Sequence, residues 1–237
     1  MLEQMLSRLI YYPDPYWILE PLHLGLEAEE VRLEPEAGVQ LHAWFFPHPE
    51  PLASLLFCHG NAGNISHRLP NVRELVDTGF QVLLFDYRGY GHSSGTPSEP
   101  GLYRDAAAAW GHLVERPDTA GAPRIIFGRS LGGAVAVDLA SQAGADADGL
   151  IVESTFTSIR TLTRLIYHLP LPELPVKYDS LSKIGQLKMP LLAIHGERDE
   201  LIPYSDGRAL FEAAPEPKTW YRILSLIHIS EPTRPPV

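Results

Sequence analysis

Ser130 is the residue best suited by its surroundings to act as a nucleophile. It stands in Gly128-Arg-Ser-Leu-Gly132, which fits G-x-S-x-G, after an apolar run and before a helical pattern. On such a sharp turn from strand to helix the serine hydroxyl is exposed, and the glycines avoid collisions with the adjacent strand and helix. The helix N-terminus would also place backbone N–H groups where a negative oxygen develops. The pattern therefore predicts nucleophilic catalysis by Ser130.

A second group of small residues follows the apolar run at 52–58 and reads His59-Gly-Asn-Ala-Gly-Asn64. Small residues after a buried strand let backbone N–H groups face a ligand. In one recurrent arrangement, such a loop supplies one oxyanion donor and the residue after the nucleophile supplies the other. These positions are Asn61 and Leu131. We expect His59 to be a hydrogen-bonded structural imidazole, and Cys58 to be a small buried hydrophobe. Neither glycine-rich phosphate-binding pattern is present, so a nucleotide is not expected.

A serine nucleophile needs a base, and the base needs a carboxylate that orients it. Asp199 lies in His195-Gly-Glu-Arg-Asp199, after an apolar run and 69 residues beyond Ser130, in the chain order Ser…Asp…His. Glu153 also ends an apolar run and remains the alternative acid. We expect Asp86 to hold its own turn and His195 to brace the turn of Asp199.

His228 is the one histidine of the chain after Asp199. The chain order therefore leaves it as the sole candidate for the base, on a loop after a strand expected at 219–224. The single cysteine, Cys58, excludes an intramolecular disulfide and a cysteine-rich zinc site, and no metal site is expected.

Apolar strands that alternate with helices must position these residues. The pattern predicts strands at 39–46, 52–58, 80–85, 124–127, 149–152, 190–194 and 219–224, and helices at 68–78, 102–115, 131–143 and around 209–213. Strands that are apolar throughout indicate a mostly parallel central sheet with helices on both faces. Ligands bind outside the carboxyl ends of the strands in such sheets, and each candidate above lies at one of those ends.

The whole chain supports an α/β architecture of one main domain. Its 237 residues carry a net charge of −10, which argues against a nucleic-acid partner, and no apolar run is long enough for a transmembrane helix. We expect a segment over 1–24, a domain over 25–224 with a lid-like excursion at 155–188, and a separate tail at 225–237. A cytoplasmic location is expected; the apolar residues of 2–10 would pack on the domain, with peripheral membrane contact as the alternative.

Four motifs together resemble the small serine hydrolases of the α/β-hydrolase superfamily: Phe57-Cys-His-Gly-Asn-Ala-Gly-Asn-Ile-Ser-His-Arg68, Asp86-Tyr-Arg-Gly-Tyr-Gly-His-Ser93, Gly128-Arg-Ser-Leu-Gly-Gly133 and His195-Gly-Glu-Arg-Asp-Glu-Leu-Ile-Pro203. The resemblance covers roughly 25–223. It implies a Ser-His-Asp triad, no cofactor, and small-molecule ester, thioester or amide substrates. Ser130 and Asp199 match the nucleophile and the acid of that family, and Asn61 and Leu131 match its oxyanion positions.

The tail at 225–237 departs from the family pattern, because its prolines forbid the closing helix of the family. It also resembles translated sequencing-adapter sequence. His228 therefore stands at the base position of the family with two interpretations open: a working base, or a histidine placed there by accident. The expected activity is hydrolysis of carboxylic esters or thioesters. A peptidase or amidase with the same triad, and a catalytically impaired hydrolase, are the alternatives.

Overall fold

The computed structural model describes residues 10–143, 146–160 and 176–224. Within these ranges one eight-stranded sheet has the order β10-β9-β8-β7-β4-β6-β3-β2, and β1 and β5 form a separate pair. The strands are β1 (Tyr12–Pro13), β2 (Glu29–Glu36), β3 (Val39–Phe46), β4 (Ala53–Cys58), β5 (Ala62–Gly63), β6 (Phe80–Phe85), β7 (Arg124–Arg129), β8 (Gly149–Glu153), β9 (Leu191–Gly196) and β10 (Lys218–Ile223).

The sheet is parallel from β6 to β10, and β3 pairs antiparallel with both β6 and β2. The predicted mostly parallel sheet is therefore confirmed. The strand β2 was missed, because Glu29-Glu-Val-Arg-Leu-Glu-Pro-Glu36 alternates apolar with charged residues only briefly and contains a proline. An edge strand tolerates both features, since one of its sides has no neighbouring strand.

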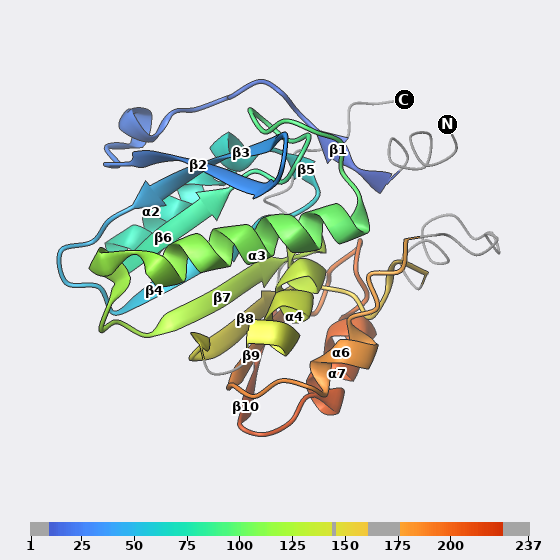
Figure 1. Cartoon of the computed structure of the whole chain (residues 1–237). Coiled ribbons are helices and arrows are strands. Elements are labelled where there is room, and N and C mark those ends of the chain that lie inside the picture. Colours follow the sequence, from blue (N-terminus) through green and yellow to red (C-terminus); the bar gives the residue numbers. More distant parts are fainter. Residues whose placement is uncertain (1–9, 144–145, 161–175, 225–237) are drawn as a thin grey trace.

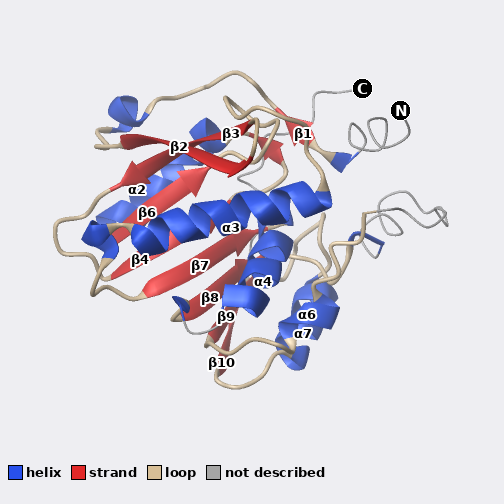
Figure 2. Ribbon diagram, viewed as in Figure 1, coloured by secondary structure: helices blue, strands red, loops and turns tan. Residues whose placement is uncertain are grey.

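Helices cover both faces of the sheet, as Figures 1 and 2 show. The longer ones are α2 (Leu69–Asp77), α3 (Glu99–Glu115), α4 (Leu131–Ala143) and α7 (Tyr204–Ala213), with the short α6 (Leu181–Ile184) and the 3₁₀ turns η1 (Pro21–Leu24), η2 (Ile65–Arg68) and η3 (Pro117–Thr119). Residues of α3, α4 and α7 share one hydrophobic cluster, whereas those of α2 belong to another. The sheet therefore separates two cores.

The central strand β4 shows why this arrangement forms. All six of its residues are buried. Leu56 and Cys58 join the cluster beneath α3 and α4, whereas Leu55 and Phe57 join the cluster beneath α2. Because side chains alternate along a strand, a strand that is apolar at every position is stable only with both faces covered.

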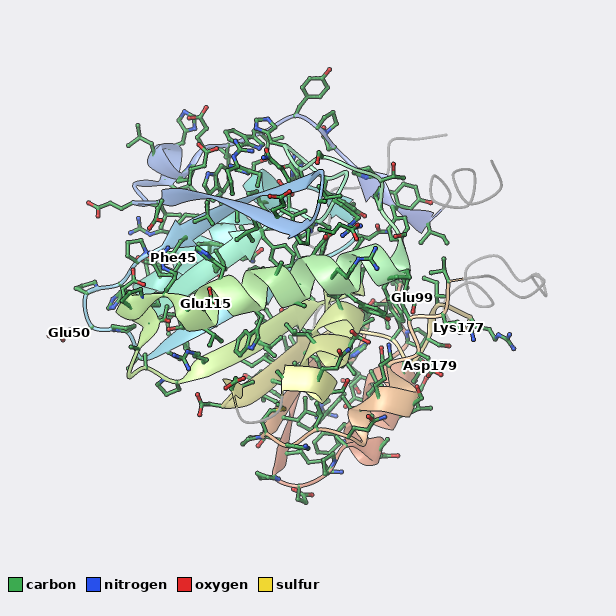
Figure 3. The ribbon with its side chains drawn as sticks, viewed as in Figure 1. Phe45, Glu50, Glu99, Glu115, Lys177 and Asp179 are labelled. Carbon is green, nitrogen blue, oxygen red and sulfur yellow. The ribbon has the colours of Figure 1, made fainter. Side chains whose placement is uncertain are left out.

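The excursion expected at 155–188 leaves the sheet after β8, and its two ends meet at its base. The N–H of Ile159 donates to the carbonyl of Lys177 (2.9 Å), and that of Leu181 donates to the carbonyl of Thr157 (3.2 Å). The Glu99 carboxylate at the start of α3 accepts the N–H groups of Lys177 (2.6 Å) and Tyr178 (2.8 Å); Figure 3 shows Glu99 beside Lys177. Residues 161–175, which include much of the expected lid, lie outside the described ranges.

Candidate active site

Ser130 lies on a strained turn between β7 and α4. Its φ of 54° is in the left-handed region, which a residue other than glycine seldom adopts. Its N–H donates to the carbonyl of Glu153 (2.9 Å), and its own carbonyl accepts the Gly133 N–H (2.9 Å) and the Thr155 hydroxyl (2.8 Å). These three bonds hold the backbone in the strained conformation that an exposed nucleophile requires.

The glycines of the motif are required by close packing. A Cβ at Gly128 would lie 2.3 Å from the carbonyl oxygen of Gly132 and 2.6 Å from the Cβ of Ala136. A Cβ at Gly132 would lie 2.0 Å from the carbonyl oxygen of Cys58 and 2.5 Å from that of His59. The first turn of α4 therefore packs directly against the end of β4 and the loop that follows it.

This contact brings together the two elements that carry the expected oxyanion positions. Leu131 is the first residue of α4, next to Gly132, and Asn61 is two residues beyond His59. Neither the Asn61 nor the Leu131 N–H donates a hydrogen bond within the described ranges. At a helix N-terminus an unpaired N–H is available to an anion. Two such donors beside a nucleophile could stabilise a developing oxyanion.

His59 is the first residue of this loop and is fully buried. Its Nδ1 is 2.7 Å from the carbonyl oxygen of Gly60, and its ring packs against Tyr87 and Tyr90. Burial, reinforced by the positive charge of Arg68, lowers the pKa of His59 to about 3. A neutral imidazole bonded to the backbone has a structural role here, and burial also raises the pKa of the adjacent Cys58 thiol far above its usual range.

Asp86 does more than hold its own turn. Its side chain accepts the N–H of Ile65 (3.0 Å), in the segment after β4, and lies 3.7 Å from His59 Nε2. Burial raises the pKa of this carboxyl to about 8, against the opposing effects of the Ile65 N–H and the Arg68 charge. Asp86 thus links the end of β6 to the loop after β4.

Asp199 lies in the loop after β9, in a conformation fixed by neighbouring backbone. Its carboxylate accepts the N–H groups of Leu201 (3.0 Å) and Ile202 (2.9 Å), and its own N–H donates to the carbonyl of Gly196 (3.3 Å). The side chain of His195 braces the same loop, with Nε2 3.0 Å from the carbonyl oxygen of Ile202. A carboxylate held in this way can orient an imidazole.

The alternative acid, Glu153, is committed to another partner. Its Oε2 accepts two hydrogen bonds from Arg129, from Nη2 (2.7 Å) and from Nε (2.9 Å), and both side chains are largely buried. Two Arg129 donors thus converge on one oxygen of Glu153, and this buried ion pair makes the carboxylate less suited to orient a histidine.

The sheet brings the elements of Ser130 and Asp199 to one edge. β7 pairs with β8 at Arg129–Glu153, and β8 pairs with β9 at Glu153–Ile194. The nucleophile and the acid therefore follow the carboxyl ends of strands that flank a single common neighbour. His228 lies outside the described residues, and so does the whole tail 225–237.

Residues 10–18 also contribute to the site, which the sequence did not indicate. β1 pairs with β5 immediately after Asn61, at the end of the sheet toward which the arrows of β6 and β7 point (Figure 1). The contacts use mainly the backbone of this segment, so its side-chain pattern carries no signal of them. Asn61 and Asn64 are the visible signal in the sequence, because their side-chain amides donate to the backbone carbonyls of this segment.

Comparison with known proteins gives a consistent assignment. The sequence model of the family described as Serine aminopeptidase, S33 matches residues 49–181. The chain is 38% identical over 225 residues to the Mycobacterium tuberculosis protein Rv2307c, covering 93% of this chain and 79% of that one. It is 34% identical over 231 residues to the Arabidopsis thaliana alpha/beta hydrolase domain-containing protein WAV2, covering 88% and 75%.

Solved structures share the fold. The Pyrococcus furiosus esterase Pf2001 superposes with a TM-score of 0.76 at 21% identity, covering 92% of this chain and 91% of that one. An alpha-beta hydrolase from Vibrio vulnificus gives a TM-score of 0.72 at 20% identity, covering 94% and 86%. Among the described residues, no helix has the length and apolar character that crossing a membrane requires. The strained serine turn, the sheet order and these relatives agree, and the chain belongs to the serine aminopeptidase S33 family of α/β-hydrolases.

Proposed function

We propose that the protein is a serine hydrolase that cleaves carboxylic esters or thioesters through an acyl-enzyme. Ser130 is the nucleophile, Asp199 the orienting carboxylate, His228 the base, and the N–H groups of Asn61 and Leu131 the oxyanion donors. The observation that carries the proposal is the φ of 54° at Ser130, held between β7 and α4 by three backbone-directed hydrogen bonds. Strain of this kind persists where surrounding structure enforces it, and it is concentrated at functional sites.

In the first step Ser130 Oγ attacks the substrate carbonyl carbon while His228 takes the hydroxyl proton. The Asn61 and Leu131 N–H groups stabilise the resulting tetrahedral oxyanion, which collapses to an acyl-serine as the proton passes to the departing alcohol or thiol. Water then attacks the acyl carbon, and the same base takes its proton and returns it to Ser130 Oγ. The products are a carboxylic acid and an alcohol or thiol.

A fluorophosphonate probe tests the nucleophile directly. The folded chain is expected to gain one adduct by intact-mass measurement. Peptide mapping should place the adduct on the peptide that contains Ser130, and Ser130→Ala should remove it. Hydrolysis of p-nitrophenyl acyl esters should fall by at least about 10⁴-fold in the same variant, as nucleophile removal does in other serine hydrolases. A folded wild-type chain that takes up no probe would contradict the proposal.

Cleavage of amides is the second candidate, because the matching family is described as a serine aminopeptidase. Ester cleavage is placed first because the Pyrococcus furiosus structural neighbour is an esterase. The ratio of kcat/KM for p-nitrophenyl esters to that for aminoacyl p-nitroanilides separates them. The amidase alternative would be preferred if anilides were turned over at comparable rates.

His228→Ala tests the base independently of the nucleophile. If His228 is the base, hydrolysis should fall by about 10⁴-fold or more while the fold is retained. Unchanged hydrolysis would remove His228 from the mechanism. Probe labelling of Ser130 with negligible turnover in the wild-type chain would identify an impaired copy of the enzyme.

A further inference from the structure

The side chain of Asn61 bonds the loop that carries it to other parts of the chain. Asn61 Nδ2 donates to the carbonyl of Ile10 (2.6 Å), and Oδ1 accepts the hydroxyl of Tyr90 (2.7 Å). The N–H of Tyr12 also approaches Oδ1 at 3.4 Å. Because the Ile10 carbonyl can only accept, the amide orientation is fixed by the bonds themselves. One side chain thus joins the loop to two distant parts of the chain.

The first of these parts is the N-terminal segment 10–18, whose backbone runs along the loop. Asp14 N–H donates to the Gly63 carbonyl (3.1 Å), and Asn64 Nδ2 donates to the carbonyls of Asp14 (2.8 Å) and Tyr16 (2.7 Å). The Ile18 N–H donates to Ser66 Oγ (2.9 Å). The segment therefore acts as a strap bound along the whole length of the loop.

The second part is the turn after β6, which contains Tyr90. Its side chain is fully buried, and its ring contacts those of His59 (5.5 Å between centroids) and Tyr87 (5.8 Å) edge-on. The N–H of the next residue, Gly91, donates to the carbonyl of Asp14 (3.2 Å). The turn is thus fixed to the strap as well as to the loop, and the Tyr90 hydroxyl has little freedom to move.

We propose that the side chain of Asn61 and the hydroxyl of Tyr90 are positioning groups that fix the loop backbone, so that the Asn61 N–H is held ready for the oxyanion. This inference rests on the proposed function. An oxyanion donor is effective because it is preorganised, and a displacement of about 1 Å can cost about 100-fold in rate. Connecting loops are otherwise the mobile parts of a fold. Asn61 then acts twice, through its backbone N–H on the substrate and through its side chain on the loop.

The test compares Tyr90→Phe, Asn61→Ala and the double variant in the full chain, with p-nitrophenyl butyrate as substrate. Tyr90→Phe removes one hydroxyl and is expected to lower kcat by about 10-fold or more, with KM within about 3-fold, because the lost interaction matters in the transition state. Asn61→Ala retains the backbone N–H and should lower kcat at least as much. The double variant should lose no more than Asn61→Ala alone, because Tyr90 acts through Asn61.

Tyr103→Phe is the matched control, because it also removes a tyrosine hydroxyl bonded to a side chain. The Tyr103 hydroxyl donates to Glu99 Oε1 (2.9 Å) and accepts from Lys183 Nζ (3.2 Å). Neither partner belongs to the loop that carries Asn61. This control should lower the thermal midpoint about as much as Tyr90→Phe while leaving kcat within about 2-fold. The inference is overturned if Tyr90→Phe keeps wild-type kcat, if its effect is entirely on KM, or if its effect persists in the Asn61→Ala background.

Hydrogen exchange supplies a readout that does not depend on activity. In Tyr90→Phe the amides of residues 59–64 should exchange faster than in the wild type, whereas those of 131–137 in α4 should not change. If the wild-type chain neither hydrolyses esters nor takes up the fluorophosphonate, the proposed function fails. Faster exchange at 59–64 would then still support the positioning role, and unchanged exchange would overturn it.

Discussion

The loops on the two sides of Ser130 are held in different ways. The loop after β4, which carries Asn61, is fixed by segments about 30 to 50 residues away in the chain, namely the N-terminal strap and the turn after β6. In the loop after β9, the carboxylate and N–H of Asp199 are bonded to Gly196, Leu201 and Ile202, all within a few positions. The start of that loop is also joined to β10, where the Glu197 N–H donates to the Ile223 carbonyl (2.9 Å). One half of the site is therefore assembled by the tertiary structure, and the other is largely a local turn.

Because they are held differently, the loop after β4 and the loop after β9 should respond differently to substitutions. Local hydrogen bonds between a carboxylate and nearby N–H groups form wherever the turn forms, so the orientation of the Asp199 carboxylate is set mainly by its own turn. A loop tied down by remote segments is lost when any of those segments moves. Substitutions far from Asn61 should therefore affect the oxyanion side, whereas the acid side should respond mainly to Asp199 itself.

Among substitutions that compare the two loops, the largest effect is expected for Asp199→Asn. Loss of the carboxylate charge leaves the imidazole in the wrong tautomer and should lower kcat by about 10⁴-fold, with the fold intact. Glu153→Gln should lower it by less than about 10-fold, because that carboxylate pairs with Arg129. Steady-state measurement of kcat in both variants shows which carboxylate is the acid. A larger loss in Glu153→Gln than in Asp199→Asn would make Glu153 the acid.

Gly132→Ala should damage the oxyanion side without touching the acid loop. Its Cβ would meet the carbonyl oxygens of Cys58 and His59, so the loop must move away from α4. We expect kcat to fall by about 100-fold or more and the free energy of unfolding to fall by about 2 kcal/mol.

The matched control is Gly185→Ala, whose Cβ would lie 3.7 Å from the nearest atom, on backbone with a φ of −68°. It should change the unfolding free energy by less than about 1 kcal/mol and leave kcat unaltered. Equal effects of the two substitutions would show that close packing at Gly132 is not what holds the loop.

Acid should lower the free energy of unfolding through His42, whose ring packs against Trp17 near the end of the strap. Burial lowers the pKa of His42 to about 4 from 6.5. As pH falls from 6.5 to 4 the unfolded chain gains a proton before the folded one does, so stability is lost in that window, by at most about 3 kcal/mol.

His42→Phe isolates this contribution, because phenylalanine suits an aromatic cluster and cannot be protonated. Urea unfolding across the same pH window should show a smaller loss of stability in the variant than in the wild type. Parallel curves for the two proteins would mean that His42 is not the group that titrates.

The smallest effect is expected for Leu201→Ser on the acid loop. The side chain of Leu201 is 48% exposed, and the loop uses its backbone N–H, which serine retains. Stability should change by less than about 0.5 kcal/mol and kcat by less than about 2-fold. A loss as large as that of Tyr90→Phe would show that the acid loop depends on side-chain packing after all.

Much of the fold could be predicted because its signals are local. The buried strands from 52–58 to 190–194 are continuous apolar runs, and each was expected within a few residues of its observed bounds. The start of α3 was expected three residues too late, since the cap at Ser98, whose hydroxyl accepts the Gly101 N–H, lies before the apolar pattern begins. The edge strand β2 was missed because its pairing with β3, and not its composition, makes it a strand.

The sequence alone determined the order of the buried strands and the longer helices, the glycine-flanked turn at Ser130 and the compact turn at Asp199, because each depends on residues close together in the chain. The tertiary structure decided which face of the sheet each helix covers, that Glu153 is paired with Arg129, and that a backbone strap from the N-terminal segment binds Asn61. Such contacts join residues tens of positions apart through main-chain groups that every amino acid possesses, and therefore leave almost no trace in the pattern of side chains.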